Sequence, residues 1–455
     1  MAFITCPLYA LVILLLAMNG TQKRERRLIQ LGFLAHVAGT FAIVAYHSYV
    51  ASGDMLGYAY YGRQLARLIS TDISYLPEVG KLALHIDNGL PAVANYDEGS
   101  AEYLVGTTTT TMFALTGLVM TLVGPTLLAT ALVFGLFAFA GTAFLYKRLR
   151  PAFEEHERIP VLCAFMFVPS VVFWSSGIVK EAVLLGFFGF LCGGLYDLLT
   201  RPRVAPAIIV LVGAAGVGLV KPYVLFPFAL SVGAWLNARS RRKHGWLTRL
   251  LAVVFALVAL AALSRLFPQF GVEKLAETVA GQQGAGVYGT TAGSYIEVGA
   301  PEERTLLGQI RFIPLALVNS LARPFLFEAK NASMLLAGME TLAAGILVVV
   351  VARRHGIRGL YGRVMARPPF VAALVFTLSF GAAVGLTTTN LGTLSRYRLP
   401  LVPMYAGVLL AMRARKASPA AASEARRAPA VLPLKVRQRR HAALERAIRA
   451  KRSAS

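Results

Sequence analysis

Apolar stretches of about 20 residues recur along the chain, and this repetition limits the possible folds more than any other feature. A helix needs about 20 apolar residues to cross roughly 30 Å of hydrocarbon, whereas the strands of a membrane barrel alternate apolar and polar residues. The composition agrees, because 56% of the residues are hydrophobic and 15% are charged, against roughly 25% charged in soluble domains. The sequence therefore predicts an all-α, polytopic transmembrane helical bundle.

The distribution of basic residues predicts how this bundle is oriented. The net charge is +24, and the Lys and Arg residues gather in short runs between apolar stretches, such as 23–27, 147–150 and 353–367. Such runs are typical of cytoplasmic loops. The order of runs and stretches predicts about 11 spans, with the N-terminus outside and the C-terminus in the cytoplasm. No folded basic domain accompanies the charge, so we expect no nucleic-acid partner.

The polar stretches divide the chain into a membrane domain, two large external loops and a tail. These are the transmembrane domain 1–412, the external loops 52–102 and 268–332 within it, and a basic cytoplasmic tail, 413–455, that we expect to be disordered. Because the inner loops are short, the long external loops place the working face of the protein outside.

Three segments carry more specific expectations. Residues 103–122 are apolar, but counting them as a crossing would place the basic run 147–150 outside. We therefore predict a re-entrant or interfacial segment there. Residues 160–177 are expected to form one span, and the Gly-rich residues 281–295 are expected to form a mobile loop.

The first candidate site follows the second predicted span. Asp54 stands at the membrane boundary, with Tyr58 one turn further along. A carboxylate in this position can act as a general base toward a hydroxyl group or bind a metal ion. The structural alternative is that Asp54 caps a helix, because an Asp side chain satisfies the free N–H groups of a first turn.

A second candidate is a charged turn between two apolar stretches. Lys180 and Glu181 meet the membrane on its external side, where charges are costly unless they are paired or solvated. We take both as candidate catalytic residues together with Asp54. The alternative is a simple polar turn.

External cations form the third group of candidates. Arg396 and Arg398 stand before the last predicted span, and positive charge on the outer side runs against the usual bias. The planar guanidinium group suits phosphate, so these residues, with Lys221 and Arg323, are candidate ligands for a lipid phosphate. Tyr58 is a further candidate for binding this substrate. The alternative is that they reach lipid headgroups along the surface. Glu340, inside an apolar stretch, is a further functional candidate, or the structural partner of an arginine.

Cysteine and histidine give no metal or disulfide signature. Cys6, Cys163 and Cys192 lie in apolar stretches without a CxxC spacing, and the histidines are scattered. The cofactor is therefore left open, with a divalent metal on Asp54 as the one candidate.

The order of these motifs resembles the integral-membrane C-type glycosyltransferases. The resemblance rests on Gly53-Asp54 with Tyr58, the segment beginning at Glu102, the Val-Pro-Ser to Lys-Glu turn at 168–181, Lys221-Pro222, and Arg-Tyr-Arg-Leu-Pro from Arg396. It implies a catalytic Asp54, and a donor phosphate held by Arg396 and Arg398. The chain is also similar to O-antigen-polymerase-like proteins, which have two large arginine-bearing external loops.

Both resemblances imply the same chemistry. We expect glycosyl transfer from a polyprenyl-linked sugar at the periplasmic face of a bacterial inner membrane, during assembly of a surface polysaccharide, with membrane lipid and other assembly proteins as partners. The alternatives are a flippase or transporter of the lipid-linked saccharide, and a non-catalytic scaffold. A transporter usually shows internal repeats, and the chain shows none.

Overall fold

The fold is all-α, as predicted. The computed structural model describes residues 2–50, 53–84, 108–240, 246–267, 272–289, 295–296, 298–299, 302 and 304–414. Within these residues the only strand-like pairing is an isolated bridge between Tyr295 and Asn390. The helices are α1 (Ala2–Met18), α2 (Lys23–Tyr49), α3 (Asp54–Thr71), α4 (Tyr75–Leu84), α5 (Thr108–Val123), α6 (Leu127–Leu149), α7 (Glu155–Met166), α8 (Pro169–Trp174), α9 (Lys180–Thr200), α10 (Val204–Val220), α11 (Leu225–Ser240), α12 (Trp246–Leu266), α13 (Val272–Gly289), α14 (Leu306–Ile310), α15 (Ile313–Ala322), α16 (Ala332–Met365), α17 (Pro368–Thr387), α18 (Leu391–Tyr397) and α19 (Val402–Arg413).

Several helices are suited to a membrane. Five stretches of helix in the described part are long and apolar enough to cross one: Lys23–Tyr49, Leu127–Ala152, Lys180–Thr200, Ser333–Met365 and Pro368–Thr387. Apolar side chains also point outward, including Leu16 on α1 and Leu257 and Val258 on α12, each more than half exposed. An outward apolar surface of this kind is what a hydrocarbon environment requires.

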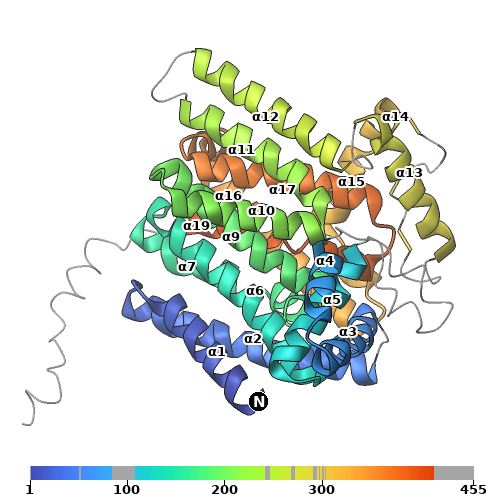
Figure 1. Ribbon diagram of the computed structural model, residues 1–455. Coiled ribbons are helices and arrows are strands. Elements are labelled where there is room, and N and C mark those ends of the chain that lie inside the picture. Colours follow the sequence, from blue (N-terminus) through green and yellow to red (C-terminus); the bar gives the residue numbers. More distant parts are fainter. Residues whose placement is uncertain are drawn as a thin grey trace, which may run out of the picture. The chain divides into compact units, whose positions relative to one another are not determined.

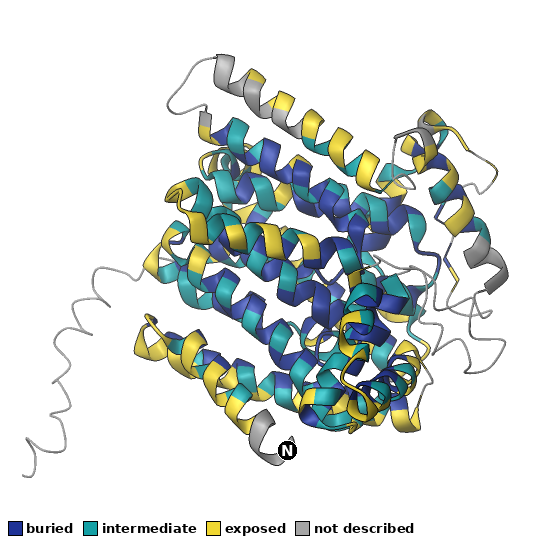
Figure 2. Ribbon diagram, in the orientation of Figure 1, coloured by how far each residue is buried: buried dark blue, intermediate teal, exposed yellow. Residues whose placement is uncertain are grey.

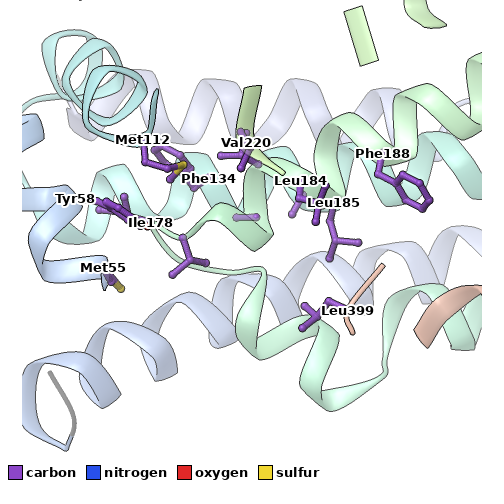
Figure 3. Packing of buried hydrophobic residues seen from close by; sticks show 14 of the residues in the cluster. Met55, Tyr58, Met112, Phe134, Ile178, Leu184, Leu185, Phe188, Val220 and Leu399 are labelled. Carbon is purple, nitrogen blue, oxygen red and sulfur yellow. The ribbon is translucent and has the colours of Figure 1, made fainter. Parts of the chain in front are cut away.

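The interior of the helical unit is a continuous apolar core. Helices α6, α9, α10, α11 and α17 lie side by side (Figure 1), and buried residues concentrate on the faces that they turn to one another (Figure 2). Figure 3 shows part of this core, where Met55 and Tyr58 of α3 lie near Ile178 and where Leu184, Leu185 and Phe188 project from α9.

Helices α6 and α9 approach each other backbone to backbone. A Cβ atom on Gly141 of α6 would lie 2.2 Å from the carbonyl oxygen of Gly186, and one on Gly189 would lie 2.2 Å from the carbonyl oxygen of Gly141. Small residues at such crossings let membrane helices pack closely. The position of α9 is therefore fixed by direct contact between main chains.

Charged contacts collect at one end of the bundle. Glu25 at the start of α2 accepts from Arg150 after α6 at 2.8 Å, and Arg148 pairs with Asp197 near the end of α9 at 3.0 Å. Arg367, before α17, holds Glu157 of α7 at 2.8 Å. The basic runs at 23–27 and 147–150 and the positions around 200 and 367 therefore share one end of the helices.

The structure corrects two local expectations and leaves others outside its described part. Residues 160–177 are not one helix, because α7 ends at Met166 and α8 begins at Pro169, which disfavours helical geometry in the residue before it. Residues 281–289 belong to α13 and are helical, so the prediction of a Gly-rich mobile loop is wrong for these residues. Residues 85–107, 290–294 and 415–455, including most of the tail, lie outside the described residues.

The contact between α6 and α9 makes a prediction about stability. Gly141→Ala should lower the free energy of unfolding by about 1–3 kcal/mol, because the new methyl group overlaps the backbone of α9. Gly345→Ala in α16, where nothing lies within 4 Å of the added atom, should leave it unchanged or raise it slightly. Denaturant unfolding in detergent micelles compares the two variants, and equal effects would contradict the close approach.

Candidate functional site

Asp54 and Arg396, which are far apart in the sequence, form an ion pair. It lies at the end of the bundle opposite the contacts of Arg150 with Glu25 and of Arg367 with Glu157. Asp54 is the first residue of α3, and its Oδ2 accepts from Nη2 of Arg396 on α18 at 2.9 Å. The side chain of Asp54 remains 51% exposed. Gly53, not Asp54, occupies the cap position of α3. The capping alternative is therefore not what the structure shows, and Asp54 is instead one half of a charge pair open to solvent.

Glu181 lies at the centre of a charge cluster that comprises Asp54, Lys180, Glu181, Lys221 and Arg396. It lies in the first turn of α9, its side chain is 2% exposed, and its Oε1 accepts from Nζ of Lys221 at 2.8 Å. The same oxygen lies 3.1 Å from Nε of Arg396, an ion-pair contact without hydrogen-bond alignment. A buried carboxylate needs such partners, since removal from water without them is costly. Glu181 therefore joins α9, α10 and α18.

Lys221 and Arg396 are further held by an aromatic ring. Lys221 is the C-cap residue of α10, directly before Pro222, and its ammonium group lies 4.0 Å from the centre of the Tyr397 ring. The guanidinium carbon of Arg396 lies 5.4 Å from the same centre. Cations are attracted to the face of an aromatic ring. Opposite charges also hold the pKa of Arg396 above its ordinary value: burial alone would lower it, and Glu181, Tyr397 and Asp54 raise it.

Lys180 reaches the cluster from the other side of α9. Its Nζ donates to Oγ1 of Thr108 at 2.9 Å and of Thr109 at 3.0 Å, at the start of α5. Within the part of the chain that the structure describes, the direct partners of this ammonium group are neutral hydroxyl groups. Lys180 can therefore offer its positive charge to an anion.

Tyr58 is a buried, uncharged neighbour of the carboxylates of Asp54 and Glu181. Its side chain is 5% exposed and packs edge-on against Phe113 of α5. Burial raises the pKa of Tyr58 well above its usual range, and the carboxylates of Asp54 and Glu181 raise it further. The phenol therefore stays protonated beside these two acids.

A cavity of about 530 Å³ opens beside the charge cluster. Lys180, Lys221 and Tyr397 belong to its wall, so two of the clustered cations face into it. Most of the remaining wall is apolar and comes from α11, α13, α15 and α17, with Leu230, Leu275, Val279, Ile313 and Ala383 among its residues. Its shape and chemistry suit an amphiphile with an anionic head.

Arg323 and Arg398 lie outside this site. Arg398 is 1% exposed and its Nη1 donates to the carbonyl oxygens of Ser320 at 3.3 Å and Arg323 at 2.6 Å. Arg323 pairs with Glu328, and the pKa of Glu328 is held below its ordinary value: burial alone would raise it, and the hydrogen bond from Arg323 lowers it. The two arginines thus tie together the segments around α15, and phosphate binding by them stays a prediction that this geometry does not favour.

Glu340 has a local structural role. Its Oε2 accepts from the backbone N–H of Ser170 at 3.0 Å, and its Oε1 accepts from the hydroxyl group of Ser170 at 2.7 Å. It thus satisfies the first turn of α8 from a different helix, α16. Neither a substrate nor an arginine is needed to explain this carboxylate.

Sequence reasoning missed the two threonines and the tyrosine of the cluster. Thr108 and Thr109 belong to a run of threonines that had no evident chemistry, and Tyr397 stands between the two candidate arginines. The position of Tyr397 within the Arg-Tyr-Arg motif was the available signal. No local pattern indicated that the threonines would meet Lys180.

A metal ion does not fit this arrangement of side chains. Within the described residues, no three His, Cys, Asp or Glu side chains come together as ligands. The guanidinium group of Arg396 lies between the carboxylates of Asp54 and Glu181, where a bridging cation would have to bind.

The chain matches no family model, no curated protein and no solved structure. What the cluster can do must accordingly follow from its own side chains. Among the described residues of this cluster, the three cations Lys180, Lys221 and Arg396 outnumber the two carboxylates of Asp54 and Glu181, which leaves an excess positive charge for an anionic ligand. One of these carboxylates, Asp54, is reachable from solvent and can accept a proton.

The two carboxylates should respond differently to neutralisation. Glu181→Gln leaves Lys221 and Arg396 buried without their main counter-charge, so the free energy of unfolding should fall by about 3–5 kcal/mol. Asp54→Asn removes only a half-exposed pair and should cost less than about 1 kcal/mol. Denaturant unfolding in detergent micelles measures both, and a larger loss in Asp54→Asn would contradict the burial described above.

Proposed function

We propose that the protein is a membrane glycosyltransferase or polysaccharide polymerase that uses a polyprenyl-linked sugar donor. One observation carries the proposal: Lys221 belongs both to the carboxylate cluster and to the wall of the apolar cavity. A ligand that fills this cavity meets the ammonium groups of Lys180 and Lys221 at one end and apolar side chains elsewhere, so an anionic group joined to an apolar body suits it. A lipid-linked phosphate has this chemistry, and a water-soluble nucleotide sugar lacks the apolar body.

The cations would hold the donor phosphate. Lys180 and Lys221 face into the cavity, and Arg396 lies next to them with a fork-shaped group that suits phosphate oxygens. The apolar walls on α11, α13 and α17 would take the first isoprene units of the lipid. Hydrophobic walls with a few charged groups at one end fix such a molecule in one orientation.

Asp54 would act as the general base. An acceptor hydroxyl group attacks the anomeric carbon of the donor sugar, the new glycosidic C–O bond forms, and the bond between that carbon and the phosphate oxygen breaks. The hydroxyl proton passes to the carboxylate of Asp54 and then to water, while the bonding electrons leave with the lipid phosphate. Lys180, Lys221 and Arg396 stabilise the negative charge on this leaving group.

The arrangement of the helix ends supports the expected orientation. Arg150 meets Glu25 at one end, whereas Lys180 meets Thr108 at the other, so α6 and α9 run between a basic end and the site. Helices α3, α4 and α5 gather at the site end (Figure 1). This supports a non-crossing segment at 103–122, about 11 spans in a bacterial inner membrane, an external N-terminus, and a site on the periplasmic face.

Transfer assays on purified protein in nanodiscs test the proposed reaction. With a labelled polyprenyl-phosphate sugar, Asp54→Asn should lower the rate of sugar transfer by on the order of 100-fold to 10,000-fold, the usual contribution of a general base. It should leave binding of polyprenyl phosphate in place. Asp72→Asn is the matched control, because Asp72 is an exposed carboxylate at the other end of α3.

The outcomes separate the alternatives. Retained transfer in Asp54→Asn would remove the assigned base, and loss of transfer in Asp72→Asn as well would indicate a general effect on α3. Lys180→Gln should weaken binding of polyprenyl phosphate, whereas the exposed Lys330→Gln should not. Movement of a labelled lipid between leaflets without any change in its sugar would favour a flippase.

Cysteine labelling tests the orientation. In a background with the native cysteines replaced, a membrane-impermeant maleimide should label Ile73→Cys, between α3 and α4, in intact cells. It should label Arg203→Cys, between α9 and α10, only after the membrane is permeabilised. Labelling of both in intact cells would mean that residues 103–122 cross the membrane, which would contradict the proposed topology.

A further inference from the structure

Three aromatic side chains form a cluster that the proposed reaction has not used. Tyr46 lies near the end of α2, and Phe173 and Trp174 end α8. Their ring centres are 5.0 Å apart for Phe173 and Trp174, 5.7 Å for Tyr46 and Phe173, and 6.2 Å for Tyr46 and Trp174, with the rings nearly perpendicular. All three side chains are partly exposed. The cluster is therefore ordered by its own contacts and still reachable.

This cluster is linked to the start of α3, where Asp54 lies, through His47. The ring of His47 packs against Gly53, where an added Cβ would lie 2.6 Å from its Cε1, and it also contacts Trp174 with ring centres 6.4 Å apart. Helix α8 packs against both α2 and α18, the helix that carries Arg396. The ring of His47 thus connects the aromatic cluster to the residue that precedes Asp54.

The aromatic cluster and the cavity are built by different elements. The cavity wall is built by residues of α11, α13, α15 and α17, with Lys180, Lys221 and Tyr397 next to the carboxylates. The aromatic rings come from α2 and α8. If the lipid of the donor occupies the cavity and its phosphate lies at the cations, its sugar still needs a binding surface, and the aromatic cluster is linked to the start of α3, which carries the proposed base Asp54, through His47.

Helix α8 is held firmly enough to serve as a support. Glu340 of α16 accepts from both the N–H and the hydroxyl group of Ser170 at its start. Pro169 fixes the first-turn geometry. A short helix held at its start in this way places its last residues, Phe173 and Trp174, with little freedom, as a binding site requires.

We propose that Tyr46, Phe173 and Trp174 form a binding platform for an uncharged saccharide beside Asp54. The inference rests on the proposed function, because it is the transfer reaction that requires a sugar there. The C–H groups on the face of a sugar ring carry partial positive charge and are attracted to the negative face of an aromatic ring. The three rings carry no charge, so the contact selects for the apolar face of a sugar and not for an acidic group.

Tryptophan fluorescence tests this platform without relying on catalysis. The chain has three tryptophans, so Trp235→Phe and Trp246→Phe leave Trp174 as the only emitter. The protein in nanodiscs is titrated with neutral tetrasaccharides of glucose, galactose, mannose and N-acetylglucosamine. We expect a saturable change in Trp174 emission with at least one of them, and no emission change from any would overturn the proposal.

Variants then show whether the ring itself binds the sugar. Equilibrium binding of the tetrasaccharide should weaken by on the order of tenfold in Trp174→Leu, and by less than about threefold in Trp174→Phe, which keeps an aromatic face. Tyr49→Leu is the matched control, because Tyr49 is an aromatic residue at the same end of α2 and is 89% exposed. Equal weakening by Trp174→Leu and Tyr49→Leu would overturn the assignment.

Two further outcomes distinguish this inference from its competitors. Quenching of Trp174 by brominated lipids, with no response to saccharide, would identify the cluster as an anchor at the membrane interface and overturn the proposal. A saccharide response in a protein that fails to bind polyprenyl phosphate would support the platform and refute the donor proposed above. Binding of polyprenyl phosphate with no saccharide response would do the reverse.

Discussion

The buried carboxylate of Glu181 is the interaction on which the working end of the molecule depends. It brings Lys221 from the end of α10 and Arg396 from α18 to the first turn of α9, and Arg396 in turn holds Asp54 of α3. Each of these charges would be costly in an apolar bundle on its own. Together they stabilise one another, so α3, the neighbouring helices α9 and α10, and α18 from near the end of the chain meet at one point.

Side chains of the same chemical type have different surroundings in this site and therefore different roles. Glu181 is buried and occupied by two cations, so it organises the site, whereas Asp54 is half exposed and can take part in chemistry. Arg396 and Arg398 differ in the same way, because one contacts carboxylates and the other is enclosed among backbone carbonyls. In both comparisons, the more deeply enclosed side chain has a structural role and the other one is available for chemistry.

Much of the architecture follows from sequence, since helix type and apolar periodicity are local properties. The charged candidates Asp54, Lys180, Glu181, Lys221 and Arg396 were also found, because charge in an apolar chain needs a reason. The sequence did not show which arginine would face the carboxylates. Arg396 and Arg398 are only two residues apart at the end of α18, so their local sequence surroundings are nearly the same. The pairing of Lys180 with Thr108 and of Glu340 with Ser170 depends on helix packing, which no single segment encodes.

The glycine contact between α6 and α9 determines which parts of the site can move to accommodate a ligand. Gly186 lies five residues beyond Glu181, about 7.5 Å along α9 at the rise of an α-helix. Two main chains in direct contact leave no flexible side chains between them to absorb a displacement, so the first turn of α9 behaves as a fixed wall. Room for ligands of different size must then come from the side chains on the opposite walls of the cavity that Lys180 lines, including those of α13.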